Sequence, residues 1–137
     1  MTIAFTASET IPRPPHDVWS TLTDWPNAAR WLPGVEAMRG EQPPRLGGVL
    51  TFTTRGAERT STITELEPDR AITLTSSQGP VTAHYRYRLT PADGGTSITL
   101  EAEVLVRGPL KLIAGVIRSS IAKEDSAQLA RLRAAVG

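Results

Sequence analysis

Short segments rich in threonine, valine and isoleucine fill the middle of this 137-residue chain, from residue 35 to residue 106. Turn-forming stretches interrupt them, and these read EQPPRLGG, TRGAER, EPDR, SQGP and PADGG. The interruptions recur at roughly the 8 to 12 residue spacing that is typical of antiparallel strands joined by short turns. This pattern predicts six consecutive strands that pair with one another in chain order.

The clearest pair of strands is VTAHYRYRLT with TSITLEAEVLV, joined by PADGG. If Leu89 lies opposite Ile98, one face of the pair is apolar throughout and includes Tyr85 and Tyr87. Tyr87 then meets Leu100, Tyr85 meets Ala102 and Ala83 meets Val104. On the other face the same register sets Arg86 against Glu101 and His84 against Glu103. Opposite charges are favoured across strands, so a single register satisfies both faces.

The N-terminal stretch IAFTASETI alternates apolar and polar positions, which predicts a seventh strand. It ends at PRPP, and proline is tolerated in the first turn of a helix because its missing amide hydrogen is not needed there. Val18, Trp19 and Leu22 then fall on one face of a short helix. The stretch DWPNAARWLPG, which carries two prolines, predicts a second short helix after a tight corner.

All three tryptophans of the chain lie in these short helices, at a constant spacing of six: Trp19, Trp25 and Trp31. Six residues rotate a helix by about 600°, or 240° after full turns, so the three rings cannot share one helical face. We expect Trp19 in the core and Trp25 partly exposed at the corner. For Trp31 a core position and a position at the mouth of a cavity are equally favoured.

A final apolar pattern over residues 110–136 predicts one helix roughly 40 Å long. Its apolar residues form two stripes that differ by about 70° in direction. Between the stripes lie Glu124, Asp125 and Gln128, and Asp125 is expected to face solvent or an arginine. The stripes comprise Leu110, Ala114, Ile117 and Ile121, followed by Leu129, Leu132 and Val136.

These elements must bury their apolar faces against one another. A long antiparallel sheet twists and curls, and a helix across its concave side closes the two layers into a grip. The sequence therefore predicts an α+β helix-grip fold. In it a curved seven-stranded antiparallel sheet wraps around a long C-terminal helix, with two short helices between strands 1 and 2. The gap that remains between helix and sheet is the candidate binding site.

The order of these segments resembles the START-like, or SRPBCC, superfamily and its branch of polyketide cyclases, dehydrases and lipid-transport proteins. The resemblance rests on PPHDVWSTLTDWPNAARWLPGVEAMRG, GGVLTF, ITELEPDRAITL and AQLARLRAAV, and it covers essentially the whole chain. It implies an apolar cavity that holds a lipid, a polyketide, a steroid-like molecule or another hydrophobic ligand. A cone of the nuclear-transport-factor type would place the long helix before the sheet, whereas this chain places it last.

Composition narrows the class of protein further. The length predicts one domain over residues 1–137. The net charge is +1, and the 13 arginines are scattered singly, which argues against nucleic acid or an anionic membrane as partner. The chain has no cysteine and no apolar run of the ~20 residues that a membrane span needs. We expect a soluble, cytoplasmic protein without integral membrane association, either a monomer or a homodimer.

Neither histidine lies at metal-ligand spacing. His84 is predicted on the outward face beside Arg86, and His16 near the start of the first helix, in both cases without a second histidine or a carboxylate at ligand spacing. Glu65 and Glu67 flank a turn and are expected to be solvated. We therefore expect no metal and no cofactor.

The candidate site residues follow from the inward faces of the predicted elements and from the resemblance. Tyr85 and Tyr87, together with Arg55, are the candidates for a catalytic role. A buried tyrosine hydroxyl needs a partner, which is more often the backbone or water and can also be a ligand. Arg55 and Arg59 flank a tight turn and either guard an opening or solubilise an edge. The many threonines either form a polar cavity wall or simply favour strands. The predicted ligand-binding residues are Trp31, Leu32, Met38, Phe52, Ile63, Leu74, Tyr85, Tyr87, Leu100, Ile113, Ile117 and Ile121.

Three functions are compatible with these features. The favoured one is binding of a hydrophobic small molecule between the sheet and the C-terminal helix, as carrier or sensor. The alternative is a polyketide cyclase or dehydratase that uses the same cavity, where proximity and modest acid or base assistance direct the reaction. A regulatory module that binds a protein partner is the third, and the sequence offers it little support.

Overall fold

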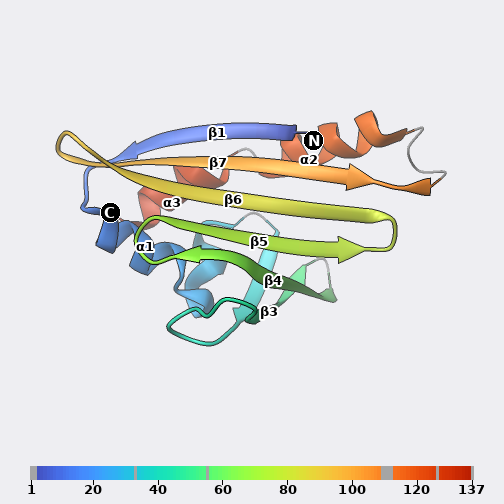
Figure 1. The fold of residues 1–137 in the computed structure, drawn as a ribbon, viewed down its shortest axis with the longest axis horizontal. Helices are drawn as coiled ribbons and strands as arrows, with labels where there is room; N and C mark the ends of the chain where they lie inside the picture. The colour runs from blue at the N-terminus through green and yellow to red at the C-terminus, as the bar shows by residue number, and fades with distance from the viewer. Residues whose placement is uncertain (1–2, 33, 55, 109–112, 126, 137) are drawn as a thin grey trace.

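The computed structural model describes residues 3–32, 34–54, 56–108, 113–125 and 127–136. In these residues seven strands form one antiparallel sheet with the order β1-β7-β6-β5-β4-β3-β2. Strands β2 to β7 pair in chain order, and β1 pairs with β7 (Figure 1). The strands are β1 (Ile3–Ile11), β2 (Val35–Arg39), β3 (Val49–Thr54), β4 (Ala57–Glu67), β5 (Ala71–Gln78), β6 (Val81–Ala92) and β7 (Gly95–Val106).

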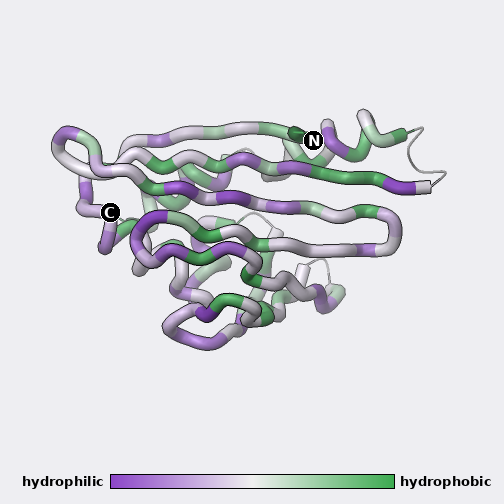
Figure 2. The backbone as a smooth tube through the Cα atoms, in the orientation of Figure 1, coloured by the Kyte–Doolittle hydropathy of each residue, from purple (hydrophilic) through white to green (hydrophobic). Residues whose placement is uncertain are grey.

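The register predicted for the last two strands is confirmed. Leu89 lies opposite Ile98, and Tyr87 lies opposite Leu100. On the outer face Arg86 lies opposite Glu101. Its guanidinium donates hydrogen bonds to the carboxylates of Glu101 and Glu103. The alternation of hydrophobic and hydrophilic positions along the strands is visible in Figure 2. One register therefore satisfies an apolar inner face and a charged outer face at once.

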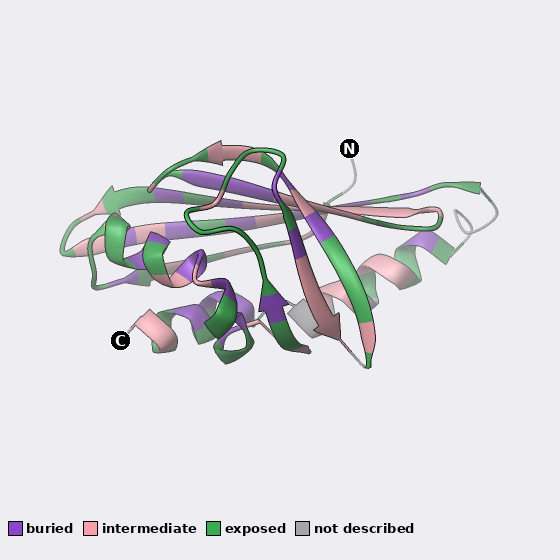
Figure 3. Cartoon of the chain, turned by 90° about the horizontal axis from the view of Figure 1, so that it is seen from below, coloured by how far each residue is buried: buried purple, intermediate pink, exposed green. Residues whose placement is uncertain are grey.

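The two predicted short helices are also present. Helix α1 (Pro15–Leu22) begins at a proline and buries Val18, Trp19 and Leu22. A 3₁₀ helix, η1 (Trp25–Arg30), follows after the corner. Together they cover the sheet on the side where the C-terminal helices also lie, as Figure 3 shows.

The prediction that Trp25 is partly exposed was wrong. Its side chain is only 2% exposed, and its indole Nε1 donates to the carbonyl oxygen of Glu41 at 3.2 Å. The stretch that follows β2 packs closely over this ring. A Cβ atom added to Gly40 would lie 2.9 Å from Trp25 Cδ1, so the chain reaches the ring only because a glycine stands there. The proline after Trp25 indicated a turn at the surface, but the segment after β2 covers the Trp25 ring.

The C-terminal region forms two helices rather than one unbroken helix. Helix α2 (Ala114–Asp125) and helix α3 (Gln128–Val136) correspond to the two apolar stripes of the sequence. A straight helix could not turn both stripes toward the sheet, because they differ by about 70°. The division lets each helix orient its own stripe. The predicted start of the helix at residues 110–112 lies outside the described residues, as do the side chains of residues 124 and 125.

The two C-terminal helices contact different parts of the core. Leu129 and Leu132 of α3 are buried in the main cluster, which also contains all three tryptophans. Helix α2 packs instead on a second cluster, formed by Ala114 with Val104 and Val106 of β7. The apolar interior is therefore continuous beneath α3 and separate beneath α2.

Candidate functional site

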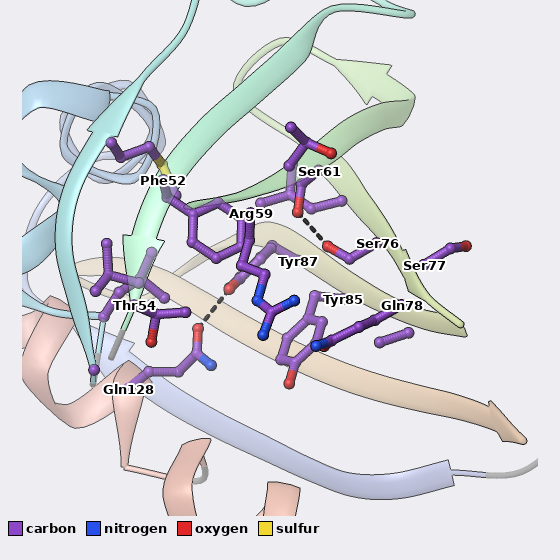
Figure 4. A pocket seen from close by; sticks show the side chains of 17 residues that line it. Phe52, Thr54, Arg59, Ser61, Ser76, Ser77, Gln78, Tyr85, Tyr87 and Gln128 are labelled. Atoms are coloured by element: carbon purple, nitrogen blue, oxygen red, sulfur yellow. Dashed lines mark hydrogen bonds between the residues drawn. The ribbon is translucent and has the colours of Figure 1, made fainter. Parts of the chain in front are cut away.

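A cavity of about 490 Å³ lies between the concave face of the sheet and helix α3. Strands β2 to β6 supply most of its wall, and the loop after η1 and the first residue of α3 complete it (Figure 4). Its volume falls within the roughly 300–1,000 Å³ of small-molecule sites. The lining residues are Leu32, Gly34, Val35, Met38, Phe52, Thr54, Arg59, Thr60, Ser61, Leu74, Ser76, Ser77, Gln78, Ala83, Tyr85, Tyr87 and Gln128.

The cavity extends from the core to the surface. Tyr87 and Gln128 at its inner end are each 1% exposed, whereas Arg59 and Gln78 at the other end are exposed. Polar groups are also more frequent toward the exposed end. The cavity is therefore open to solvent where β4 begins and β5 ends, and it is closed beneath α3.

Strand alternation explains which side chains enter the cavity. Residues two apart share one face of a strand, so Leu74, Ser76 and Gln78 of β5 point inward together. Tyr85 and Tyr87 of β6 do so for the same reason, since Tyr85 lies opposite Leu74. The sheet thus supplies apolar residues near the core and small hydroxyl or amide residues near the opening.

A buried polar pair closes the inner end of the cavity. Tyr87 Oη donates a hydrogen bond to Gln128 Oε1 at 2.5 Å. The rings of Trp31 and Tyr87 pack edge to face, with 6.1 Å between the ring centroids. Gln128 is the first residue of α3, so the division of the C-terminal helix brings this amide to the cavity. The pair fixes the position of α3 relative to β6.

Trp31 lies behind the cavity wall. It is 2% exposed, and its indole Nε1 has no hydrogen-bond acceptor among the described residues. It does not line the cavity itself. Of the two positions left open for Trp31, the structure favours the core.

Hydrogen bonds organise the polar end of the cavity. The hydroxyl groups of Ser61 and Ser76 lie 2.5 Å apart and share a hydrogen bond across β4 and β5. Beside them, the amide of Gln78 meets the guanidinium of Arg59. With its oxygen turned toward Arg59, the amide accepts from both terminal nitrogens, at 2.7 and 2.5 Å. These contacts hold polar groups at fixed places along one wall.

Six of the predicted ligand-binding residues meet in this cavity: Leu32, Met38, Phe52, Leu74, Tyr85 and Tyr87. The other six do not line it. Trp31, Ile63 and Leu100 are buried in the main core cluster instead. Ile117 and Ile121 pack on the second cluster under α2, and Ile113 is 47% exposed. Arg55, a candidate for catalysis, lies outside the described residues.

Sequence reasoning placed several other lining residues elsewhere or left their role open. Gln128 was one of three polar residues between the two apolar stripes, and no role was assigned to it. Arg59 was left open between an opening and an exposed edge, and the structure places it at the opening. The hydroxyl-rich strands contained a signal for a polar wall, but strand propensity explains them equally well. The lining residues absent from the predicted set are Gly34, Val35, Thr54, Arg59, Thr60, Ser61, Ser76, Ser77, Gln78, Ala83 and Gln128.

The two histidines, whose side chains are the best suited to metal binding or acid-base chemistry, do not line the cavity. His16 Nδ1 lies 3.2 Å from the Asp69 carboxylate at the surface. His84 Nδ1 lies 2.8 Å from the hydroxyl oxygen of Thr75 on the outer face of the sheet. Within the described part of the chain, no cluster of histidine, aspartate and glutamate could hold a metal ion. Among the described residues that line the cavity there is no histidine and no carboxylate.

The structure clearly perturbs the ionisation of Glu103, which lies on the outer face of the sheet. Its residue is 6% exposed, and it accepts a hydrogen bond from Arg86 Nη2 at 3.0 Å. This hydrogen bond holds the pKa of the Glu103 carboxyl below its ordinary value, although burial acts in the opposite direction. The pair stabilises the β6–β7 ladder on the face opposite the cavity.

Among the residues that the structure describes, no helix has the length and apolar character needed to cross a bilayer.

Comparison with solved structures supports the helix-grip fold. The Zhui aromatase/cyclase from Streptomyces sp. R1128 has a TM-score of 0.76 at 16% identity, covering 96% of this chain and 92% of that one. The di-domain ARO/CYC StfQ from the steffimycin biosynthetic pathway gives 0.74 at 13% identity, covering 97% of this chain and 50% of that one. Ara h 8.0201 gives 0.70 at 17% identity, covering 96% and 95%. Identities this low show a shared fold alone.

No curated protein matches the chain. The family described as polyketide cyclase/dehydrase and lipid transport, however, matches residues 2–137. The match spans nearly the whole chain, and it agrees with the resemblance seen in the sequence. This protein therefore belongs to the polyketide cyclase/dehydrase and lipid transport family.

Proposed function

We propose that this protein binds a hydrophobic small molecule in the cavity between the sheet and α3, as a carrier or sensor. The observation that supports this most directly is the cavity itself, which reaches 490 Å³ in a chain of 137 residues. Its inner wall offers Met38, Phe52 and Leu74, and its outer wall offers hydroxyl and amide groups. A ligand with an apolar body and an oxygen-bearing end matches this division.

The residues at the cavity favour binding over catalysis. General bases in enzymes are chiefly histidine and carboxylate side chains, and the described lining residues include neither. The Tyr87 hydroxyl already donates to Gln128 within the protein. The cavity thus has groups that hold a ligand in a fixed orientation, while a group that accepts a proton at neutral pH is missing from its described wall.

Ligand recovery tests this proposal. We expect native mass spectrometry and solvent extraction of the purified protein to recover a hydrophobic small molecule. We also expect a library of hydrophobic compounds to contain members that raise the melting temperature. If nothing is recovered and no compound stabilises the protein, the proposal is refuted.

A matched pair of variants assigns the binding to this cavity. Ala83→Phe adds a ring on the cavity face of β6, so ligand stabilisation should disappear. Thr82→Phe adds the same ring to the neighbouring residue, which points to the opposite face and does not line the cavity. It should retain ligand stabilisation. Equal binding by both variants would place the ligand elsewhere.

A second candidate is cyclisation of a poly-ketone chain in the same cavity. The observation that favours it is that Arg59, Tyr85 and Tyr87 all line the same cavity, where hydrogen-bond donors can stabilise a developing oxyanion. Two solved structures with this fold carry aromatase/cyclase or ARO/CYC in their names. In such a reaction a methylene carbon of the chain attacks a carbonyl carbon of the same chain, and the methylene proton finally resides on the carbonyl oxygen.

Turnover distinguishes this candidate from simple binding. We expect Tyr85→Phe and Tyr87→Phe to slow the cyclisation of a poly-ketone if the phenols assist it. Unchanged turnover in both variants would contradict that role. A protein that binds such a chain without forming a cyclised product would leave binding as the function.

A further inference from the structure

Arg59 is the feature of the cavity that specifies its ligand most closely. Among the described residues that line the cavity, it alone carries a formal charge. It lies on β4 directly opposite Phe52 of β3. Figure 4 shows its side chain passing Phe52 and directing the guanidinium toward Gln78 and Tyr85. A cation therefore faces a space whose inner walls are largely apolar.

The partner of Arg59 within the protein is a neutral amide. With its amide oxygen turned toward Arg59, Gln78 accepts two hydrogen bonds from the guanidinium through that single oxygen, which satisfies donors but leaves the charge uncompensated. No described carboxylate forms an ion pair with Arg59. The amide oxygen occupies the position that one oxygen of a carboxylate would take. The guanidinium is thus positioned for a bidentate anion that the described protein residues do not supply.

Strand geometry, rather than a shortage of acids, leaves this charge unpaired. Glu58 precedes Arg59 directly, but successive side chains of a strand point to opposite faces. Glu58 accordingly pairs with Arg39 on the outer face at 3.3 Å. Other arginines also reach carboxylates, namely Arg45, Arg86, Arg88 and Arg133. Arg59 differs from all of these in facing the cavity.

The neighbouring serines add donors at the same place. Ser61 follows Arg59 by two residues and so shares its face of β4, and its hydroxyl bonds to that of Ser76. Two hydroxyl groups carry two protons, and the bond between them uses one. The second proton can be donated to an oxygen of a ligand.

We infer that the ligand is an amphipathic organic acid whose carboxylate binds Arg59 and whose apolar body extends toward Met38 and Leu74. This inference rests on the proposed function and specifies the chemical class of its ligand. The two coplanar oxygens of a carboxylate match the fork of a guanidinium, whereas a hydroxyl or amide of the same size offers one acceptor and no charge. The carboxylate displaces the Gln78 amide and takes its two hydrogen bonds.

Two matched pairs of probes test this preference by isothermal titration calorimetry: naphthaleneacetic acid with naphthaleneacetamide, and decanoic acid with decanol. We expect each acid to bind the wild-type protein about tenfold more tightly than its neutral counterpart, given one charge-assisted contact near the surface. Arg59→Gln should remove this difference and leave the neutral probes nearly unchanged. Arg59→Lys should retain part of the difference, because it keeps the charge without the fork.

A charge-matched control separates a local effect from net charge. Arg70 is exposed and lies in the turn beyond the far end of β4, and it does not line the cavity. Arg70→Gln changes the net charge by the same amount, and it should retain the preference for acids. Thermal melting of each variant checks that the fold is intact.

The outcomes distinguish this inference from the proposed function. If acids and neutral probes bind equally well, or if Arg59→Gln keeps the preference, the inference is overturned while hydrophobic binding stands. If Arg70→Gln loses the preference as Arg59→Gln does, a general charge effect overturns it as well. If no probe of either kind binds, both the inference and the proposed function are contradicted.

Discussion

The buried hydrogen bond between Tyr87 and Gln128 is the contact whose removal tests most directly how the cavity is built. Both residues are 1% exposed, and the donor and acceptor oxygens lie 2.5 Å apart. Tyr87→Phe leaves the Gln128 carbonyl oxygen without this donor, which costs about 1–3 kcal/mol of unfolding free energy. Gln128→Leu keeps the volume and leaves the hydroxyl without this acceptor, at a similar cost. The double variant leaves neither group.

We therefore expect the double variant to lose about 1–2 kcal/mol less than the sum of the two single variants. Urea unfolding followed by tryptophan fluorescence measures all three differences, and Trp31 beside Tyr87 reports on the site. Thermal melting should agree, at about 3–5 °C for each kcal/mol in a chain of this size. If the single effects add to within about 0.5 kcal/mol, the two groups are not coupled. The inner end of the cavity would then not depend on this bond.

Three further predictions concern the surrounding structure. Gly40→Ala should lower the melting temperature, because the added Cβ would clash with Leu50 Cδ2 and would lie only 2.9 Å from Trp25 Cδ1. Trp31→Ala should cost about 3–5 kcal/mol in urea unfolding yet change ligand affinity little, because the ring lies behind the wall; a large loss of affinity at intact fold would contradict this placement. The hydrogen bond from Arg86 lowers the pKa of Glu103 in the folded state relative to its unfolded value of about 4.5. The stability that this carboxylate provides is therefore fully present above the unfolded pKa, and it is lost as the pH falls through the lower folded pKa. Glu103→Gln should therefore flatten the decline in urea midpoint between pH 5 and pH 3.

The sheet was predictable because each of its faces carries independent information. In the β6–β7 pair the apolar partners of Tyr85 and Tyr87 and the opposite charges of Arg86 and Glu101 select the same register. A shift of one residue would have placed both sets on the wrong face. The predicted inward residues of these strands accordingly do face the helices.

The boundary between core and cavity could not be read from the sequence in the same way. Ile63 and Leu74 lie opposite each other on β4 and β5, yet Leu74 lines the cavity and Ile63 does not. The difference depends on how closely the helices approach each point of the sheet, which no local pattern specifies. Gln128 was missed for a related reason: its direction depends on the division between α2 and α3. Trp25 was misplaced because a segment about 15 residues later covers it.

The size of the cavity helps to explain why polar and apolar residues both line it. At about 24 cal/mol per Å³, an empty apolar cavity of 490 Å³ would cost about 12 kcal/mol, close to the whole net stability of a typical domain. The open, polar end admits water and reduces this penalty, but water beside Phe52 and Leu74 finds few hydrogen-bond partners. A side chain that fills this space should therefore stabilise the ligand-free protein. Ala83→Phe is expected to melt no lower than the wild type when both are free of ligand, and to gain nothing when ligand is added. If it melts well below the wild type, the cavity is too constrained to accept a ring, and the estimated penalty for leaving it empty is too high.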